Sequence, residues 1–339
     1  MIQFLKSAKL AGLFLLMFSV GVMIVSCVSS NTGDKNKDQD NNAEHEHSYV
    51  CDEENSIKAR ALSDGKMFYK CTECGHSYTE TVPATKSFKV LAIGNSFSED
   101  ATAHLYDICK SAGIEEIVIG NLFIGGCSLN THLTNIKGNI AGYDFQLNTS
   151  GKWEHNYKST VSQALEYTDW DFITLQQVSG YTGIYSSYGS MHAILEHLET
   201  NKPKDATEIY WHMTWAYQQN STHTDFSKYE KSQMKMYQMI VDTTKNKVLA
   251  DQLIDGVIPS GTAIQNLRTS PLGDVITRDG YHLSIGAGRY TAALTWFSTL
   301  TGGDLDDVKY FEFIDKKSIE YIFKSVGDAV KAPYQVTEF

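Results

Sequence analysis

Short apolar runs alternate with longer amphipathic segments from about residue 87 to the C-terminus. A short run bounded by turn residues is typical of a buried strand, and apolar residues three or four positions apart are typical of a helix. The predicted strands are Val90–Ile93, Glu116–Leu122, Phe172–Leu175, Ile209–Met213 and Val257–Ile258. The predicted helices are Ala101–Ser111, Leu129–Ile136, Val161–Tyr167, Met191–Glu199, Tyr229–Thr244 and Ile285–Leu300. This alternation predicts an α/β domain with a parallel sheet and right-handed crossovers.

One segment departs from the alternation. Residues 143–157 contain two polar-apolar stretches around Asn148-Thr-Ser-Gly151, which predicts a hairpin inserted beside the sheet. Residues 86–339 together have the length of one α/β domain with a substantial core.

The N-terminus has the pattern of a secretory signal. Lys6 and Lys9 precede an apolar run from Leu10 to Val25, which is short for a bilayer span and ends in small residues. We therefore interpret residues 1–26 as a signal peptide, with a weak membrane anchor as the alternative. Ile24-Val-Ser-Cys27 resembles a bacterial lipobox, and this resemblance implies lipidation of Cys27 and attachment to a membrane of the bacterial cell envelope, on a side that the sequence does not define.

Charge and composition then narrow the possible partners. Residues 27–44 are almost entirely polar, so they predict a flexible tether.

The chain carries 29 Lys and Arg against 40 Asp and Glu, a net charge of −11. Because an acidic surface repels nucleic acid and no basic patch interrupts it, the sequence excludes nucleic-acid binding.

Residues 45–85 form a second small unit that is rich in cysteine and histidine. Its candidate metal ligands are His47, Cys51, Cys71, Cys74 and His76. Cys71-Thr-Glu-Cys74-Gly has the spacing with which two thiolates bind one zinc ion in zinc ribbons, although a second Cys-x-x-Cys is absent. A disulfide is the alternative, and either bond would stabilise so short a β module. Any zinc held here would be structural.

The strongest candidate for chemistry is Ser96. The apolar run Val90–Ile93 ends at Gly94, Ser96 follows, and a helical segment begins, so the serine is predicted at the carboxyl end of a strand. Far along the chain, Asp279 and His282 are three residues apart, a spacing that lets a carboxylate orient an imidazole. A capping serine and a plain Asp-Gly turn are the alternatives.

These blocks resemble the SGNH (GDSL-type) hydrolases. Gly94-Asn-Ser96-Phe-Ser98 is similar to the first block of that superfamily, and Asp279-Gly-Tyr-His282 is similar to the last. Together with Leu175-Gln-Gln-Val-Ser-Gly and Trp211-His-Met-Thr-Trp-Ala-Tyr, they resemble a bacterial lipoprotein branch of it. The resemblance implies a flavodoxin-like three-layer α/β/α fold and ester hydrolysis by a triad of Ser96, His282 and Asp279, without a cofactor.

The resemblance also implies an oxyanion hole. Its donors would be the backbone N–H of Ser96, a glycine N–H and a side-chain amide. Gly126 is the expected glycine, with Gly125 in reserve. Where the superfamily has an asparagine this chain has Gln176 and Gln177, and either amide could donate; Gln176 is preferred. Asn95 replaces the usual aspartate of the first block.

The expected activity is removal of O-acetyl groups from carbohydrate. Trp215 and Tyr217, near the end of a strand, are candidate platforms for a sugar ring. Two alternatives remain at this point: a lipase or general carboxylesterase on the same triad, and a lipoprotein that binds glycans without catalysis.

Overall fold

The computed structural model describes residues 46–312 and 314–339 of the chain. The predicted signal peptide, the tether and Cys27 lie outside these residues. Within the described part of the chain, no helix combines the length and the apolar character needed to cross a bilayer.

The cysteine-rich segment forms a small antiparallel sheet. Its strands are β1 (Tyr49–Cys51), β2 (Gly65–Cys71) and β3 (Ser77–Val82), in the order β1-β2-β3. Tyr49 lies opposite Cys71 in the register of β1 and β2. The Cys-x-x-Cys stretch therefore forms the turn from β2 to β3, and the residues just before β1 lie beside that turn.

A seven-stranded sheet follows, with the strand order β10-β9-β8-β4-β5-β6-β7. Its strands are β4 (Ser87–Gly94), β5 (Glu116–Phe123), β6 (Tyr143–Asn148), β7 (Trp153–Ser159), β8 (Phe172–Leu175), β9 (Glu208–His212) and β10 (Gly256–Ile258). The five strands from β10 to β5 are parallel, which confirms the predicted α/β fold with a mostly parallel sheet. All of β8 and β9 and most of β4 is buried, as expected of strands covered on both faces.

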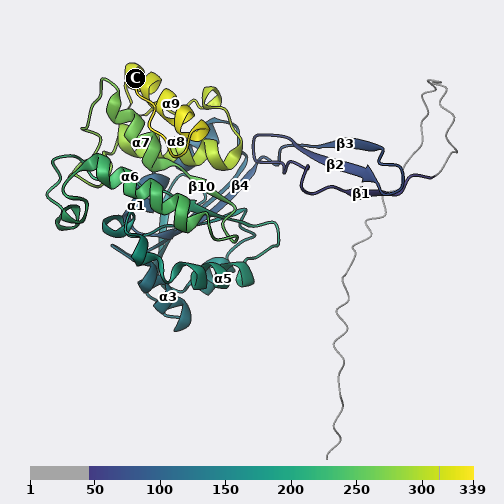
Figure 1. The fold of residues 1–339 in the computed structure, drawn as a ribbon, viewed down its shortest axis with the longest axis horizontal. Helices are drawn as coiled ribbons and strands as arrows, with labels where there is room; N and C mark the ends of the chain where they lie inside the picture. The colour runs from purple at the N-terminus through teal and green to yellow at the C-terminus, as the bar shows by residue number, and fades with distance from the viewer. Residues whose placement is uncertain (1–45, 313) are drawn as a thin grey trace, which may run out of the picture. The chain divides into compact units, whose positions relative to one another are not determined.

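The helices cover both faces of this sheet. They are α1 (Ser96–Thr102), α2 (Leu105–Ser111), α3 (Leu129–Lys137), α4 (Val161–Leu165), α5 (Met191–Asn201), α6 (Gln233–Thr243), α7 (Ser260–Thr269), α8 (Ala287–Thr301) and α9 (Lys316–Lys331). Helix α8 packs against α1, α2, α7 and α9, whereas α3 packs against α4 and α5. Figure 1 shows α7, α8 and α9 across the strands from α3 and α5.

Two parts of the domain differ from the prediction. The predicted hairpin is present, but β6 pairs with β5, so the hairpin extends the main sheet with two antiparallel strands. The predicted helix over Ala101–Ser111 is divided into α1 and α2, because the backbone leaves the helix at His104. His104 Nε2 lies 2.9 Å from the carbonyl of Ile285, a tertiary contact that local sequence does not reveal.

Candidate active site

Ser96 is the first residue of α1 and lies two positions after Gly94, the last residue of β4. Asn95 makes the turn between them, because its side-chain oxygen accepts the backbone N–H of Phe97 at 3.0 Å and caps the helix. The other serine of this block, Ser98, lies with its hydroxyl 2.7 Å from Asn121 Oδ1 in the interior. Of the two hydroxyls, that of Ser96 faces the second half of the site.

The second half of the site is the segment between α7 and α8. His282 Nε2 lies 2.8 Å from Ser96 Oγ, and His282 Nδ1 lies 2.6 Å from Asp279 Oδ2. Asp279 Oδ1 also accepts the backbone N–H of His282 at 2.8 Å and that of Tyr281 at 3.2 Å. Gly280 allows this tight turn with a φ of +90°, in the region that favours glycine. The structure thus brings together the three residues predicted from two distant sequence blocks.

These contacts define where the proton on His282 lies. Burial raises the pKa of the Asp279 carboxyl, but the hydrogen bonds from His282 and Tyr281 outweigh burial, and the net shift is downward. An ionised carboxylate can only accept, so Nδ1 of the neutral ring donates to it. The lone pair on Nε2 then faces the hydroxyl of Ser96, which is the arrangement needed to take up its proton.

A buried carboxylate absent from the sequence prediction, Asp100, fixes the position of this segment. Asp100 lies on α1, four residues after Ser96, and is fully buried. It accepts Arg278 Nη1 at 2.9 and 3.0 Å, Arg289 Nε at 2.8 Å and the backbone N–H of Leu283 at 2.8 Å. Because Arg278 and Leu283 flank the acid and the histidine, one carboxylate holds both ends of their segment to the serine's helix.

Gln176 braces the turn before Ser96. Its amide nitrogen donates to Asn95 Oδ1 at 2.8 Å, and its amide oxygen lies 2.8 Å from His212 Nδ1. Burial lowers the pKa of His212 to about 3, so this ring is neutral and donates to Gln176. One of the two amide hydrogens of Gln176 is therefore committed to the cap, and only the other is available for an oxyanion.

Gln177 has a different place. Its amide oxygen accepts the backbone N–H of Leu129 at 3.1 Å, and its amide nitrogen lies 3.0 Å from both the carbonyl and the hydroxyl of Ser187. Both amide hydrogens are thereby directed at Ser187. Contrary to the prediction, the structure does not offer Gln177 as an oxyanion donor, because it joins the start of α3 to the loop after β8.

Gly125 and Gly126 lie in the exposed loop between β5 and α3. This loop is held beside the Ser96 turn, because Asn95 Nδ2 donates to the carbonyl of Cys127 at 3.1 Å. The side chain of Asn95 therefore links the first turn of α1, the glycine loop and Gln176. A glycine N–H near the serine remains the prediction for the second oxyanion donor.

Trp215 and Tyr217 are fully buried, so the prediction that they form a sugar platform is wrong. The Trp215 indole stacks on Phe97, with ring centroids 4.4 Å apart, and its Nε1 donates to the carbonyl of Tyr281 at 2.8 Å. The hydroxyl of Tyr217 lies 2.9 Å from that of Ser179. Trp215 therefore supports the site from the interior, through the neighbours of Ser96 and His282.

In the small sheet the structure gathers three of the five candidate metal ligands, and Cys51 and His76 are not in the group. The ligand atoms of His47, Cys71 and Cys74 all lie within 4.8 Å of one another. Cys51 stays outside this group, with its Sγ 3.7 Å from the hydroxyl of Ser56, which corrects the prediction that included it. Cys51 and Cys74 are not joined in a disulfide.

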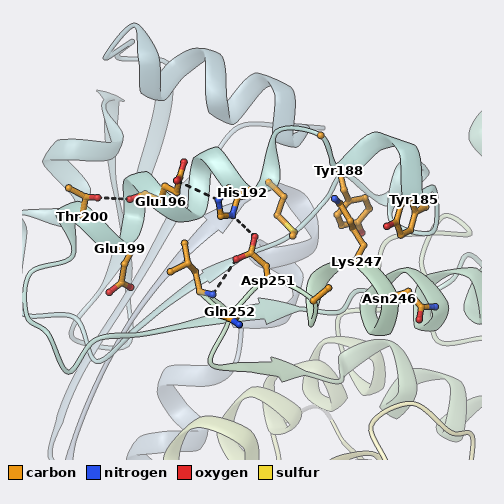
Figure 2. Close-up of a pocket in the computed structure, with 14 residues that line it drawn as sticks. Tyr185, Tyr188, His192, Glu196, Glu199, Thr200, Asn246, Lys247, Asp251 and Gln252 are labelled. Atoms are coloured by element: carbon orange, nitrogen blue, oxygen red, sulfur yellow. Dashed lines mark hydrogen bonds and ion pairs between the residues drawn. The ribbon is translucent and has the colours of Figure 1, made fainter.

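One cavity lies beside the candidate site, and a second lies apart from it. A cavity of about 480 Å³ adjoins Asp279 and has a largely polar lining: Gln218, Asn220, Ser221, Thr222, Thr277, Arg278, Asp279 and Gly280, with Val275 as its large apolar member. A second cavity, of about 720 Å³, has none of the predicted site residues in its lining. Figure 2 shows it between α5 and the segment around Asp251, where His192 Nδ1 lies 2.8 Å from Asp251 Oδ2.

Comparison with known proteins gives the family. No curated protein matches the chain. A solved structure of a DUF4886 family protein from Bacteroides uniformis is 42% identical, has a TM-score of 0.72, and covers 75% of this chain and 98% of its own. A Bacteroides fragilis protein with the provisional name of acylhydrolase is 11% identical, with a TM-score of 0.38 over 75% of this chain and 91% of its own. The DUF4886 profile, described as a domain of unknown function, matches residues 89–319, and the chain belongs to this family.

Proposed function

We propose that this protein is a serine ester hydrolase of the SGNH type. The observation that carries the proposal is the continuous hydrogen-bonded series from Asp279 through His282 to Ser96, with successive distances of 2.6 and 2.8 Å. Acid, imidazole and hydroxyl in this order form the arrangement that activates a serine for acyl transfer.

The proposed reaction follows from these positions. Ser96 Oγ attacks the ester carbonyl while His282 Nε2 takes up the hydroxyl proton and then delivers it to the departing alkoxide. Asp279 stabilises the imidazolium formed in between. The backbone N–H of Ser96 has no carbonyl four residues back within its helix, so it is available to the oxyanion, together with a glycine N–H such as that of Gly126. Water then cleaves the acyl-enzyme by the same route, and no metal enters the scheme.

We further propose that the substrate is an O-acetylated carbohydrate. The cavity on the Asp279 side of the triad, whose lining includes neither Ser96 nor His282, supports this choice over a lipase. Amides, hydroxyls and an arginine dominate its lining and suit the hydroxyl groups of a sugar. A lipase would need a broad apolar surface for acyl chains. Burial of Trp215 and Tyr217 means that any stacking on the sugar must come from other residues.

The test is acetate release from a panel of acetylated polysaccharides by the parent protein and by Ser96→Ala. We expect the variant to lose at least about 10³-fold in rate, because it lacks the nucleophile. Ser98→Ala is the matched control, since its hydroxyl is bonded inside the domain; it should keep hydrolysis while losing some stability. Equal rates for parent and Ser96→Ala would refute catalysis and favour a protein that only binds glycans. Nitrophenyl esters of increasing acyl chain length distinguish a deacetylase from a lipase or general carboxylesterase, since a deacetylase prefers the acetate ester.

Attachment to the bacterial envelope through a lipid on Cys27 is a separate proposal, supported by the lipobox-like sequence around this residue. In the native host the parent should partition into detergent, whereas Cys27→Ala should partition into water. Mass spectrometry of the N-terminal peptide should find the acyl chains on Cys27. An unmodified Cys27 in the mature protein would end this proposal.

A further inference from the structure

The group formed by His47, Cys71 and Cys74 has the donor chemistry of a metal site. Thiolate sulfur and imidazole nitrogen together are the ligands of structural zinc, whereas magnesium and calcium prefer oxygen. His47 Nδ1 lies 3.3 Å from Cys74 Sγ. With Zn–N near 2.0 Å and Zn–S near 2.3 Å, a tetrahedral ion holds such a pair about 3.5 Å apart. The observed spacing is thus already close to that of two ligands on one ion.

The backbone explains why these three residues meet. Cys71 ends β2, Cys74 lies in the following turn, and the backbone N–H of Gly75 donates to the carbonyl of Cys71 at 3.1 Å. This hydrogen bond closes the turn, in which the two sulfurs lie within 4.8 Å of each other. The carbonyl of Ser48 accepts the backbone N–H of Thr72 at 3.0 Å, which holds the chain just before β1 against the same turn.

The pairing of β1 with β2 decides which residue completes the group. Tyr49 lies opposite Cys71, so His47, two residues earlier, extends past the end of β2 toward the Cys-x-x-Cys turn. Cys51 lies opposite Tyr69, on the side away from the turn. Sequence spacing alone allows either residue, and the register selects the histidine.

The surroundings leave room for a full coordination shell. Cys71 is buried while His47 and Cys74 are exposed, so an ion would lie at the surface with one side open. The ring of His76 stacks on that of His47 with centroids 5.1 Å apart. The Nδ1 of His76 lies 2.7 Å from the hydroxyl of Tyr49, so a water molecule is the expected fourth ligand of a tetrahedral ion.

We propose that His47, Cys71 and Cys74 bind one zinc ion, which fastens the start of β1 to the turn between β2 and β3. The ion has no part in ester hydrolysis, since its ligands belong to the small sheet and the candidate catalytic residues do not. Binding is independent of the proposed enzymatic function, and its test does not require activity.

The test uses the untagged full chain, reduced, loaded with zinc and freed of excess metal. Elemental analysis should find about one zinc per chain in the parent and in Cys51→Ser, and well under half of that in Cys74→Ser and His47→Ala. Cys51→Ser is the matched control, because it removes a thiol from the same sheet without touching the group. Equal loss of zinc in Cys51→Ser would overturn this ligand set.

A second measurement protects the test against variants that fail to fold. Cobalt replacing zinc in the parent should give the strong visible absorption of a tetrahedral site and a near-ultraviolet band from thiolate ligands. A parent that binds neither ion after reduction would overturn the proposal. So would peptide mapping that finds Cys71 and Cys74 joined in a disulfide that excludes metal.

Discussion

Replacing Asp100 with asparagine tests how the candidate site is held together. The two carboxylate oxygens of Asp100 accept hydrogen bonds from Arg278, Arg289 and the backbone N–H of Leu283, and the residue is fully buried. An asparagine has the same shape, but one oxygen becomes an NH₂ group. In either orientation that group faces a donor, because Arg289 Nε points at one oxygen and the Leu283 N–H at the other.

The size of the effect follows from burial. Removing one partner of a buried ion pair costs about 3–5 kcal/mol. The two arginine side chains are 35% and 24% exposed, so water can replace part of what they lose. We therefore expect Asp100→Asn to lower the free energy of unfolding by about 2–3 kcal/mol, a fall of roughly 5–10 °C in melting temperature for a domain of this size.

The effect on rate separates positioning from mere stability. Arg278 and Leu283 flank the acid and the histidine, so a loosened segment displaces the imidazole from Ser96. A displacement of about 1 Å can cost about 10²-fold in rate. We expect kcat on nitrophenyl acetate to fall by about 10- to 100-fold at 20 °C, well below the melting temperature, while KM changes by less than about threefold.

Asp171→Asn is the matched control. Asp171 also accepts a cation and a backbone N–H, from Lys204 at 2.7 Å and Lys89 at 2.9 Å, but it precedes β8 at the amino ends of the parallel strands. It should lose stability and keep its kcat. If both variants lose similar stability and Asp100→Asn keeps the parental kcat, Asp100 is a structural residue only and the positioning argument fails.

Three further predictions concern stability and the site. Burial depresses the pKa of His212 to about 3. Below about pH 6.5 the unfolded chain therefore binds a proton that the folded chain excludes, and the free energy of unfolding decreases as the pH is lowered. Between pH 6.5 and 4.5 this residue alone should cost about 2 kcal/mol, and denaturant titrations should show a flatter pH dependence in His212→Asn; an unchanged slope would refute the assignment. Gly94→Ala should abolish hydrolysis or folding, because an added Cβ would lie 2.5 Å from the hydroxyl of Ser98; a soluble variant with the parental rate would contradict this. Trp215→Phe should lower the melting temperature by weakening the stack on Phe97 while leaving KM nearly unchanged, and a large rise in KM alone would show that the indole contacts substrate.

The sequence predicted the features that arise locally. A buried strand ending at Gly94 and a serine at the start of a helix can both be inferred from a few neighbouring residues. Asp279 and His282 are equally local, because three residues of backbone are enough to join a carboxylate to an imidazole. The parallel sheet follows from repeated alternation of short apolar runs and helical segments.

The features that escaped prediction depend on distant partners. Asp100 forms no pattern with arginines that follow it by 178 and 189 positions, so its role becomes visible only in the folded domain. Trp215 is a residue type that often stacks on sugar rings, and only the folded domain shows that its side chain is fully buried. The choice of His47 over Cys51 depends on strand register, which places Cys51 opposite Tyr69 and His47 beyond the end of β2.

The distance along the chain between the serine and its histidine has a consequence for biosynthesis. Ser96 Oγ and His282 Nε2 meet across 186 positions of sequence. At about 5–20 residues per second, a ribosome needs about 10–40 seconds to extend the chain from one to the other. Under the proposed mechanism, the growing polypeptide throughout that interval holds Ser96 without the base that would deprotonate it, so a chain that ends before residue 282 should have no esterase activity.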